Sequence, residues 1–256
     1  MPFLTCHGVD IHWQQSGDGS PVVLVHGFGE SCERLWEQSF EGASFVDALI
    51  AGGHRAVRFD LRGHGRSTLS RDQSDYVIEK LVDDVAAVVR EADADDAHFV
   101  GFSLGAELAF RYLLRDGVCA RSAAFIGMGK PVLRPRRRAT ALAVGALTTD
   151  DPSDLHPALL KLRRIHTEHG NDLVAIATLL RAEIERVALL PEQLCELTLP
   201  TLFISGEREQ AMGDAQPIAD LVSGSRVVRI PGADHDTTPR TAKARNAVLA
   251  FLNEHE

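Results

Sequence analysis

A serine lies at the centre of a Gly-x-Ser-x-Gly pentapeptide at Gly101–Gly105, between a strand-like run and a helix-forming run. A turn this sharp places its central residue in a sparsely populated backbone region, and the two glycines remove the Cβ atoms that would collide. The turn would present the Ser103 hydroxyl beside the N-terminus of a helix, whose free N–H groups favour a developing anion. The pattern predicts nucleophilic attack on a carbonyl carbon.

Two later loops offer the partners that such a nucleophile needs. A serine hydroxyl requires a base at neutral pH, and a neutral imidazole oriented by a carboxylate is suited because the carboxylate also stabilises the imidazolium that forms. His235 follows the strand-like run Arg226–Ile230, and Glu209 follows the run Thr201–Ser205. The chain order Ser103, Glu209, His235 therefore predicts a nucleophile, an acid and a base.

Other carboxylates lie close to these residues in the sequence. They are Glu207, Asp214, Asp234 and Asp236. The first two compete with Glu209 for the role of the acid, and the two that flank His235 are expected to point to solvent. We predict that Glu209 orients His235.

Strand-like and helix-like runs alternate along most of the chain. The first two extended segments, Phe3–Cys6 and Val9–Gln15, predict an antiparallel hairpin at a sheet edge. Six further strand-like runs are Val22–Val25, Ala56–Phe59, the run before Gly101, Ala123–Gly127, Thr201–Ser205 and Arg226–Ile230. Helical patterns fall near 45–50, 75–92, 106–114, 215–222 and 247–252. This alternation predicts a mostly parallel eight-stranded sheet flanked by helices on both faces.

The alternation is interrupted between residues 130 and 195. This segment contains several helical stretches and no strand-like run. We predict that 130–195 is a helical insertion over the carboxyl ends of the strands, where ligands bind in open α/β sheets. Residues 1–129 and 196–256 would then form the core of the molecule.

Short motifs occur in order along the chain: His26-Gly27-Phe28-Gly29, Asp60-Leu61-Arg62-Gly63-His64-Gly65-Arg66-Ser67, Gly101-Phe102-Ser103-Leu104-Gly105, Gly206-Glu207-Arg208-Glu209 and Gly232-Ala233-Asp234-His235. In this combination the chain resembles the α/β-hydrolase fold superfamily over all but the insertion. The resemblance implies an α/β-hydrolase fold, a cap at 130–195, and an oxyanion hole made by the backbone N–H groups of Phe28 and Leu104. The family usually has aspartate where this chain has Glu209, so the longer side chain requires a displaced loop.

The identity of residue 103 narrows the reaction. Haloalkane dehalogenases and epoxide hydrolases of this superfamily use aspartate there, and a serine disfavours both. Because serine forms an acyl-enzyme, we expect a serine hydrolase, an esterase or lactonase, that cleaves a small carboxylic ester or lactone. Two alternatives stay open: a C–C bond hydrolase of the meta-cleavage-product type, and a non-catalytic ligand-binding protein of the same fold.

Composition limits the class of partner. The chain of 256 residues is 45% hydrophobic and carries a net charge of -9, which argues against a nucleic-acid partner. It contains no apolar run of about 20 residues, as a membrane span requires, and no signal-peptide pattern, so we expect a cytoplasmic protein. The cysteines, Cys6, Cys32, Cys119 and Cys195, lack metal-ligand spacing and are expected to be free thiols. The sequence predicts a small-molecule substrate, no metal and no cofactor.

Several other polar residues are assigned structural roles. His26 and His64 are expected to support their loops through hydrogen bonds. His166 and His169, at helical i, i+3 spacing, are expected on an exposed face of a cap helix rather than in a metal site. The basic cluster of Arg134 and Arg136–Arg138 is expected to form a solvated entry to the cap.

Overall fold

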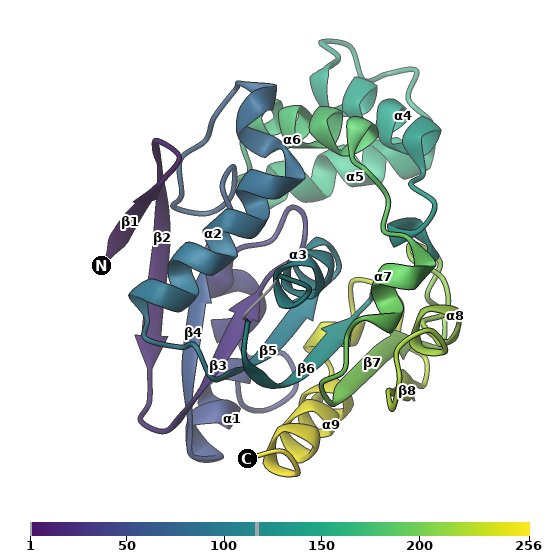
Figure 1. Cartoon of the computed structure of the whole chain (residues 1–256). Coiled ribbons are helices and arrows are strands. Elements are labelled where there is room, and N and C mark those ends of the chain that lie inside the picture. The colour runs from purple at the N-terminus through teal and green to yellow at the C-terminus, as the bar shows by residue number, and fades with distance from the viewer. Residues whose placement is uncertain (1, 116–117) are drawn as a thin grey trace.

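In a computed structural model, which describes residues 2–115 and 118–256, one eight-stranded sheet crosses the molecule (Figure 1). Its strands are β1 (Phe3–Cys6), β2 (Val9–Ser16), β3 (Ser20–Val25), β4 (His54–Phe59), β5 (Ala97–Phe102), β6 (Ala120–Ile126), β7 (Thr201–Gly206) and β8 (Arg226–Ile230). Their spatial order is β1-β2-β4-β3-β5-β6-β7-β8. Pairing is antiparallel for β1–β2 and β2–β4 and parallel for all the others, which confirms the predicted sheet. Positions 1, 116 and 117 of the predicted core lie outside the described residues.

The central strands are apolar because both of their faces are covered. In β3, Val23 and Val25 face one hydrophobic core, and Val22 and Leu24 face a second core on the other side of the sheet. A strand that alternates between two buried faces has no polar positions, which explains the continuous apolar run. Strand β3 pairs with β4 on one side and with β5 on the other.

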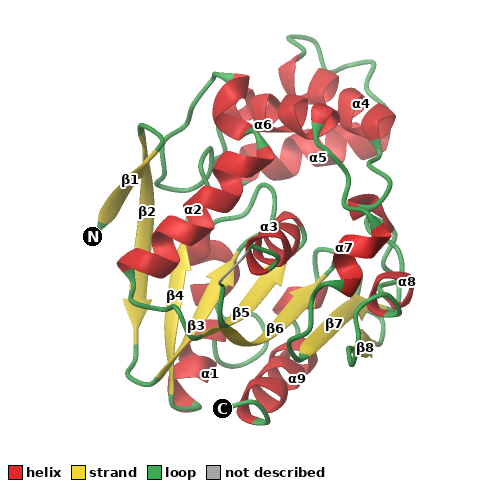
Figure 2. Cartoon of the chain, viewed as in Figure 1, coloured by secondary structure: helices red, strands yellow, loops and turns green. Residues whose placement is uncertain are grey.

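Helices form a layer on each face of the sheet (Figure 2). The first core lies under α2 (Ile78–Glu91), α3 (Leu104–Leu113) and the short α8 (Gln216–Ala219). The second core lies under α1 (Phe45–Ala51) and α9 (Ala242–Asn253). Shorter helical turns occur at Glu33–Glu37, Gln73–Tyr76, Lys130–Val132 and Thr238–Arg240.

Two helices differ in length from the sequence prediction. Helix α9 begins at Ala242 rather than near 247, because the Thr241 hydroxyl caps it by accepting a hydrogen bond of 3.1 Å from the N–H of Ala244. The apolar run leaves out the first turns of this helix, although Ala244 and Arg245 are buried there. Helix α8 covers Gln216–Ala219 instead of 215–222, and the Ser225 hydroxyl donates to the carbonyl of its last residue at 2.8 Å.

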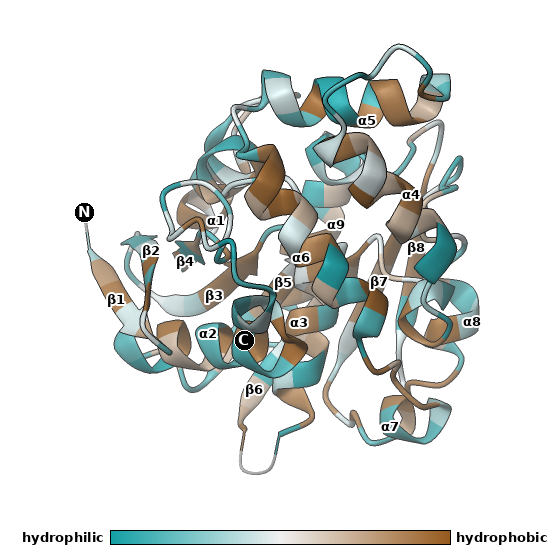
Figure 3. Cartoon of the chain, turned by 90° about the horizontal axis from the view of Figure 1, so that it is seen from above, coloured by the Kyte–Doolittle hydropathy of each residue, from teal (hydrophilic) through white to brown (hydrophobic). Residues whose placement is uncertain are grey.

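The segment 130–195, all of which the structure describes, contains four α-helices and no strand. These are α4 (Arg137–Thr148), α5 (Pro157–Glu168), α6 (Leu173–Glu185) and α7 (Pro191–Cys195). Helices α4, α5 and α6 lie beyond the carboxyl ends of the parallel strands (Figure 1). Viewed from above, hydrophobic and hydrophilic bands alternate along α5, as expected for a helix with one covered face (Figure 3). Among the described residues, no helix is both long and apolar enough to cross a membrane.

Candidate active site

The turn between β5 and α3 holds Ser103 in a strained backbone conformation. Its φ of 53° and ψ of -116° lie in a region that non-glycine residues rarely occupy. A methyl group at Gly101 would lie 2.5 Å from the Cα of Ala106, and one at Gly105 would overlap the carbonyl oxygens of Val25 and His26. The Ser103 N–H donates to the carbonyl of Ile126 in β6 at 2.8 Å. The turn is therefore fixed by close packing on two neighbouring strands.

The three residues predicted from sequence lie within hydrogen-bonding distance of one another. His235 Nε2 is 2.9 Å from Ser103 Oγ, and His235 Nδ1 is 2.8 Å from Glu209 Oε2. An ionised carboxylate only accepts hydrogen bonds, so Nδ1 carries the proton and Nε2 presents its lone pair to the hydroxyl. The arrangement can move a proton from Ser103 to His235.

The environment of Glu209 keeps its carboxyl group ionised. The side chain is only 2% exposed. Burial raises the pKa of this carboxyl, but the hydrogen bonds from His235 and from the backbone N–H of Met212, 2.9 Å away, outweigh burial and lower the pKa below its usual range. A buried anion beside the imidazole stabilises the imidazolium state.

The competing carboxylates have other partners. Glu207 accepts a hydrogen bond of 2.8 Å from the backbone N–H of Gly232, and Asp214 forms an ion pair of 2.7 Å with Arg229. Asp234 accepts from the hydroxyl of Thr237, and Asp236 is exposed. The loop after β7 is tied to the loop after β8 by backbone hydrogen bonds, including Arg208 N–H to the carbonyl of Ala233 at 2.8 Å. These contacts place the longer glutamate side chain against the ring.

Phe28 and Leu104, whose backbone N–H groups were predicted to form an oxyanion hole, line a cavity together with Ser103. Leu104 is the first residue of α3, so its N–H has no helical carbonyl partner. In the described chain, the N–H of Phe28 also has no protein acceptor. The loop around Phe28 is held by two buried histidines that accept backbone hydrogen bonds, His26 from Leu61 at 3.0 Å and His64 from Gly29 at 2.9 Å. The sequence analysis expected this supporting role.

His64 can accept that hydrogen bond only while its ring is neutral. Burial, followed by the nearby His26, lowers the pKa of His64 to about 3. The ring is therefore uncharged near neutral pH, and it stays an acceptor for the N–H of Gly29. Burial likewise lowers the pKa of His26.

A cavity of about 200 Å³ opens beside Ser103. It is lined by Phe28, Ser103, Leu104, Glu107, Pro131, Pro135, Arg136, Thr140, Leu179, Leu180, Glu183, Arg186, Ala211 and Met212. The lining comes from the loop after β3, from α3, from the segment 130–195 and from the loop after β7. A ligand in this cavity would therefore contact both α3 and the segment 130–195.

One wall of the cavity is charged, which was not predicted from the sequence. Arg186, which follows α6, pairs with Glu107 of α3 and, at 3.1 Å, with Glu183 of α6. Arg111 contacts the other carboxylate oxygen of Glu107, with Nη2 2.9 Å from Oε1. Burial raises the pKa of Glu183 to about 7, although Arg186 lowers it. The signal available in the sequence was Glu107, a charged residue one turn after Ser103 in an otherwise apolar run.

The expectation for His166 was wrong. Its side chain is buried rather than exposed, and its ring packs edge-on against the Phe28 ring with centroids 5.0 Å apart. Asn171 Nδ2 lies 3.1 Å from His166 Nδ1. The face of α5 that carries His166 is therefore turned toward the loop that presents Phe28. His169 is only partly buried.

The basic cluster at the start of the insertion is exposed, as expected. Arg134 and Arg136–Arg138 all have exposed side chains. Arg136 also lines the cavity, and its guanidinium donates to the carbonyl of Gln210 at 3.3 Å. This contact joins the insertion to the loop that carries Glu209.

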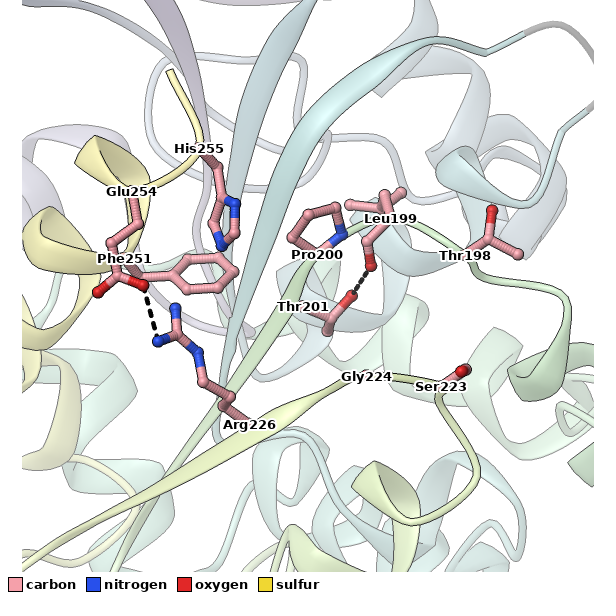
Figure 4. Close-up of a pocket in the computed structure, with 10 residues that line it drawn as sticks. All are labelled: Thr198, Leu199, Pro200, Thr201, Ser223, Gly224, Arg226, Phe251, Glu254 and His255. Atoms are coloured by element: carbon pink, nitrogen blue, oxygen red, sulfur yellow. Dashed lines mark hydrogen bonds and ion pairs between the residues drawn. The ribbon is translucent and has the colours of Figure 1, made fainter.

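A second cavity, of about 360 Å³, lies at the opposite end of the sheet (Figure 4). Its lining includes Thr201 and Arg226, the first residues of β7 and β8, whereas Glu209 and His235 follow the last residues of these strands. Its charged groups are already paired, with Arg226 2.8 Å from Glu254. None of the residues of the Ser103 site lines this cavity, so it is not the candidate active site.

Comparison with known proteins gives a family and a fold. The sequence model of the Alpha/beta hydrolase family matches residues 22–245. Among curated proteins, epoxide hydrolase B of Mycobacterium tuberculosis is 38% identical over 135 residues, which cover 49% of this chain and 36% of that protein. The chain thus spans only about a third of the length of this relative.

Solved structures match over nearly the whole chain at low identity. A hydrolase from Pseudomonas aeruginosa PA01 superposes with a TM-score of 0.80 at 21% identity, covering 98% of this chain and 97% of the other. The enol-lactonase from Burkholderia xenovorans LB400 gives a TM-score of 0.73 at 24% identity, covering 98% and 100%. At this level of identity the similarity establishes the fold.

Proposed function

The chain belongs to the alpha/beta hydrolase family, and from that premise we propose that it is a serine hydrolase that cleaves a small carboxylic ester or lactone. The observation that carries the proposal is the pair of contacts on His235, with Ser103 Oγ at 2.9 Å on one ring nitrogen and Glu209 Oε2 at 2.8 Å on the other. In this proposal Ser103 is the nucleophile, His235 the general base and Glu209 the acid that orients it.

The reaction would proceed through two acyl transfers. Ser103 Oγ attacks the carbonyl carbon while His235 Nε2 takes its proton, and the negative charge that forms on the carbonyl oxygen faces the N–H groups of Phe28 and Leu104. His235 then protonates the leaving alcohol, which departs as the acyl-enzyme forms. Water then attacks the acyl group while His235 takes its proton. His235 passes that proton to Ser103 Oγ as the carboxylic acid product leaves, which restores the free serine.

The insertion would act as the cap that sets substrate size. It supplies Leu179, Glu183 and Arg186 to the cavity wall, and the cavity volume of about 200 Å³ suits a small ester rather than a long acyl chain. The charged wall would favour a substrate with a polar group remote from the reacting carbonyl, because buried charges are stabilised by hydrogen-bonding partners.

Epoxide hydrolysis is not proposed, although one relative carries that name. Residue 103 is a serine, whereas the epoxide hydrolases of the superfamily are expected to use an aspartate. A hydroxyl nucleophile whose base lies at hydrogen-bonding distance instead fits acyl transfer.

Turnover of short p-nitrophenyl esters tests the proposal. The wild-type protein should hydrolyse p-nitrophenyl acetate or butyrate, and Ser103→Ala should lower kcat by about 10⁴- to 10⁶-fold while its circular dichroism spectrum is unchanged. Cleavage of a vinylogous diketone with no ester turnover would favour the C–C hydrolase. Ester turnover that survives in Ser103→Ala would reject Ser103 as the nucleophile, and no turnover of either substrate would favour a binding protein.

A further inference from the structure

Two buried histidines and a glutamate converge at the edge of the sheet opposite to Ser103. His54 is the first residue of β4 and His98 the second residue of β5, and these strands lie on either side of β3. Glu256 follows α9, whose end lies near the beginnings of the parallel strands, far from α4–α6 (Figure 1). The Oε1 atom of Glu256 is 3.1 Å from His54 Nδ1 and 3.7 Å from His98 Nε2.

The ring nitrogens that face Glu256 are buried and lack a hydrogen bond. Within the described chain, His54 Nδ1 and His98 Nε2 are among the few buried side-chain atoms without a hydrogen-bond partner. Buried polar atoms are nearly always satisfied, and an ion is one of the groups that explain an exception. Two such atoms directed at one carboxylate oxygen therefore call for a common ligand.

The opposite nitrogen of each ring is held by an oxygen atom. His54 Nε2 lies 3.1 Å from Asn253 Oδ1, and His98 Nδ1 lies 2.8 Å from Ser122 Oγ. An amide oxygen only accepts, so His54 Nε2 carries a proton. Metal-binding histidines commonly make such an oxygen contact through one ring nitrogen and bind the metal through the other.

Glu256 is oriented in the same way. Its Oε2 atom accepts a hydrogen bond of 2.6 Å from Ser20 Oγ and lies 3.5 Å from Arg121 Nη1. These contacts occupy one oxygen and turn the other toward the two imidazoles. All three ligand atoms lie within 4.8 Å of one another.

We propose that His54, His98 and Glu256 form a binding site for a divalent transition-metal ion of the zinc type. Zinc binds imidazole nitrogen and carboxylate oxygen at about 2.0–2.2 Å in tetrahedral geometry, which places neighbouring ligand atoms roughly 3.3–3.5 Å apart. The two separations from Glu256 Oε1, 3.1 Å and 3.7 Å, bracket that spacing. A water molecule would complete four-coordination.

The donor set selects against hard cations. Magnesium and calcium prefer sites made of oxygen atoms, whereas imidazole suits zinc and its neighbours in the first transition row. Ligating histidines must be neutral.

A second group of three, His12, Cys32 and Asp60, lacks these features. Asp60 accepts hydrogen bonds from the backbone N–H of Cys32 at 2.8 Å and from His12 Nδ1 at 3.0 Å. The other nitrogen of His12 contacts Gln14 at 3.3 Å. Burial, followed by the charge of Asp60, raises the pKa of the Cys32 thiol, and a protonated thiol is a poor ligand. This group is satisfied by the protein itself.

The site would join the end of α9 to the beginnings of β4 and β5. A metal ion that binds the folded chain but not the unfolded chain stabilises the folded state by mass action. The role is structural, because these residues lie at the edge of the sheet away from Ser103 and His235.

Zinc titration of chelator-treated full-length protein tests the site. We expect one equivalent of Zn²⁺ to bind by calorimetry, and zinc at about 100 times Kd to raise Tm by about 5–10 °C. Mg²⁺ and Ca²⁺ should have no effect. Glu256→Gln, at an exposed position, and His98→Gln should each weaken zinc binding on the order of 100-fold, and the exposed His156→Gln should bind as the wild type does.

Three outcomes would overturn the proposal. One is the absence of stoichiometric zinc binding to the wild type. Another is a zinc-induced rise in Tm that is equal in the wild type and Glu256→Gln, since Glu256→Gln retains the fold even where a core histidine variant does not. The third is loss of zinc binding in Cys32→Ser, which would assign the ion to the other group.

Discussion

The two edges of the sheet use the same kinds of side chain in different arrangements. At the carboxyl edge, both ring nitrogens of His235 have a partner, with Ser103 at 2.9 Å and Glu209 at 2.8 Å. At the amino edge, His54 and His98 each keep one buried nitrogen without a hydrogen bond, and both face Glu256. The first arrangement is a line of donors and acceptors, and the second brings two ring nitrogens to one carboxylate oxygen.

Because the two sites contain the same types of side chain, the pattern of hydrogen bonds on the histidine nitrogens is what distinguishes a proton-transfer site from a candidate metal site. A line from carboxylate to imidazole to hydroxyl moves one proton in one direction. Two imidazole nitrogens and a carboxylate oxygen that meet at one point can instead share a cation. Variants that change one edge should therefore leave the properties of the other edge intact.

Removal of the central imidazole should have the largest effect. His235→Gln leaves the Ser103 hydroxyl without a base, so kcat for a short ester should fall on the order of 10⁵- to 10⁶-fold. Its zinc affinity should equal that of the wild type, because the proposed metal site lies at the other edge. Steady-state kinetics and calorimetry on the same preparation make the comparison. A variant that lost both properties would show that the two edges are coupled.

Neutralising the acid should have the next largest effect. Glu209→Gln keeps the size of the side chain but can hold the ring in the wrong tautomer, and kcat should fall by about 10⁴-fold. Asp214→Asn is the matched control, because Asp214 is exposed and pairs with Arg229, and its kcat should stay within about twofold of the wild type. Equal losses in the two variants would refute the assignment of Glu209.

The carboxyl edge also depends on close backbone packing. Because a methyl group at Gly105 would overlap the carbonyl oxygens of Val25 and His26, Gly105→Ala should lower the free energy of unfolding by about 2–3 kcal/mol. Gly145→Ala, in α4 with open space around its Cα, should instead raise it by about 0.5–1 kcal/mol. Denaturant titration measures both, and a Gly105→Ala protein as stable as the wild type would contradict the packing argument.

The smallest effect concerns the charged wall of the cavity. The pKa of Glu183 is raised from 4.5 in the unfolded chain to about 7, so between these values the folded state binds more protons and stability falls as pH rises. Glu183→Gln should lose that slope, which is at most about 1.4 kcal/mol per pH unit. Denaturant titrations between about pH 5 and 8 compare the two proteins. Parallel stability curves would be inconsistent with the raised pKa.

The carboxyl edge could be predicted because its residues are marked locally. Ser103 lies in a strand–turn–helix pattern, and His235 and Glu209 follow strand-like runs, so parallel topology alone brings their loops to one edge. The hairpin β1–β2 was marked in the same way by its turn. These predictions need only a few neighbouring residues in the sequence and the rule that the carboxyl ends of parallel strands lie at the same end of the sheet.

The remaining features depend on tertiary packing. His54 and His98 approach one site because their strands, β4 and β5, pair on either side of β3. Neither segment of the sequence indicates this order of strands. The sequence also did not indicate which faces of α5 and α6 are covered. The segment 130–195 packs on the rest of the protein through residues such as His166, and Glu183 lines the cavity. Helical periodicity identifies such a helix but not the partner that it covers.

A fluorophosphonate probe reports whether Ser103 is an activated nucleophile, because only an activated serine reacts rapidly with it. We expect mass spectrometry to find the adduct on the peptide containing Ser103, and the labelling rate to fall by orders of magnitude in His235→Gln. No adduct on Ser103, or equal labelling rates in the two proteins, would contradict this expectation.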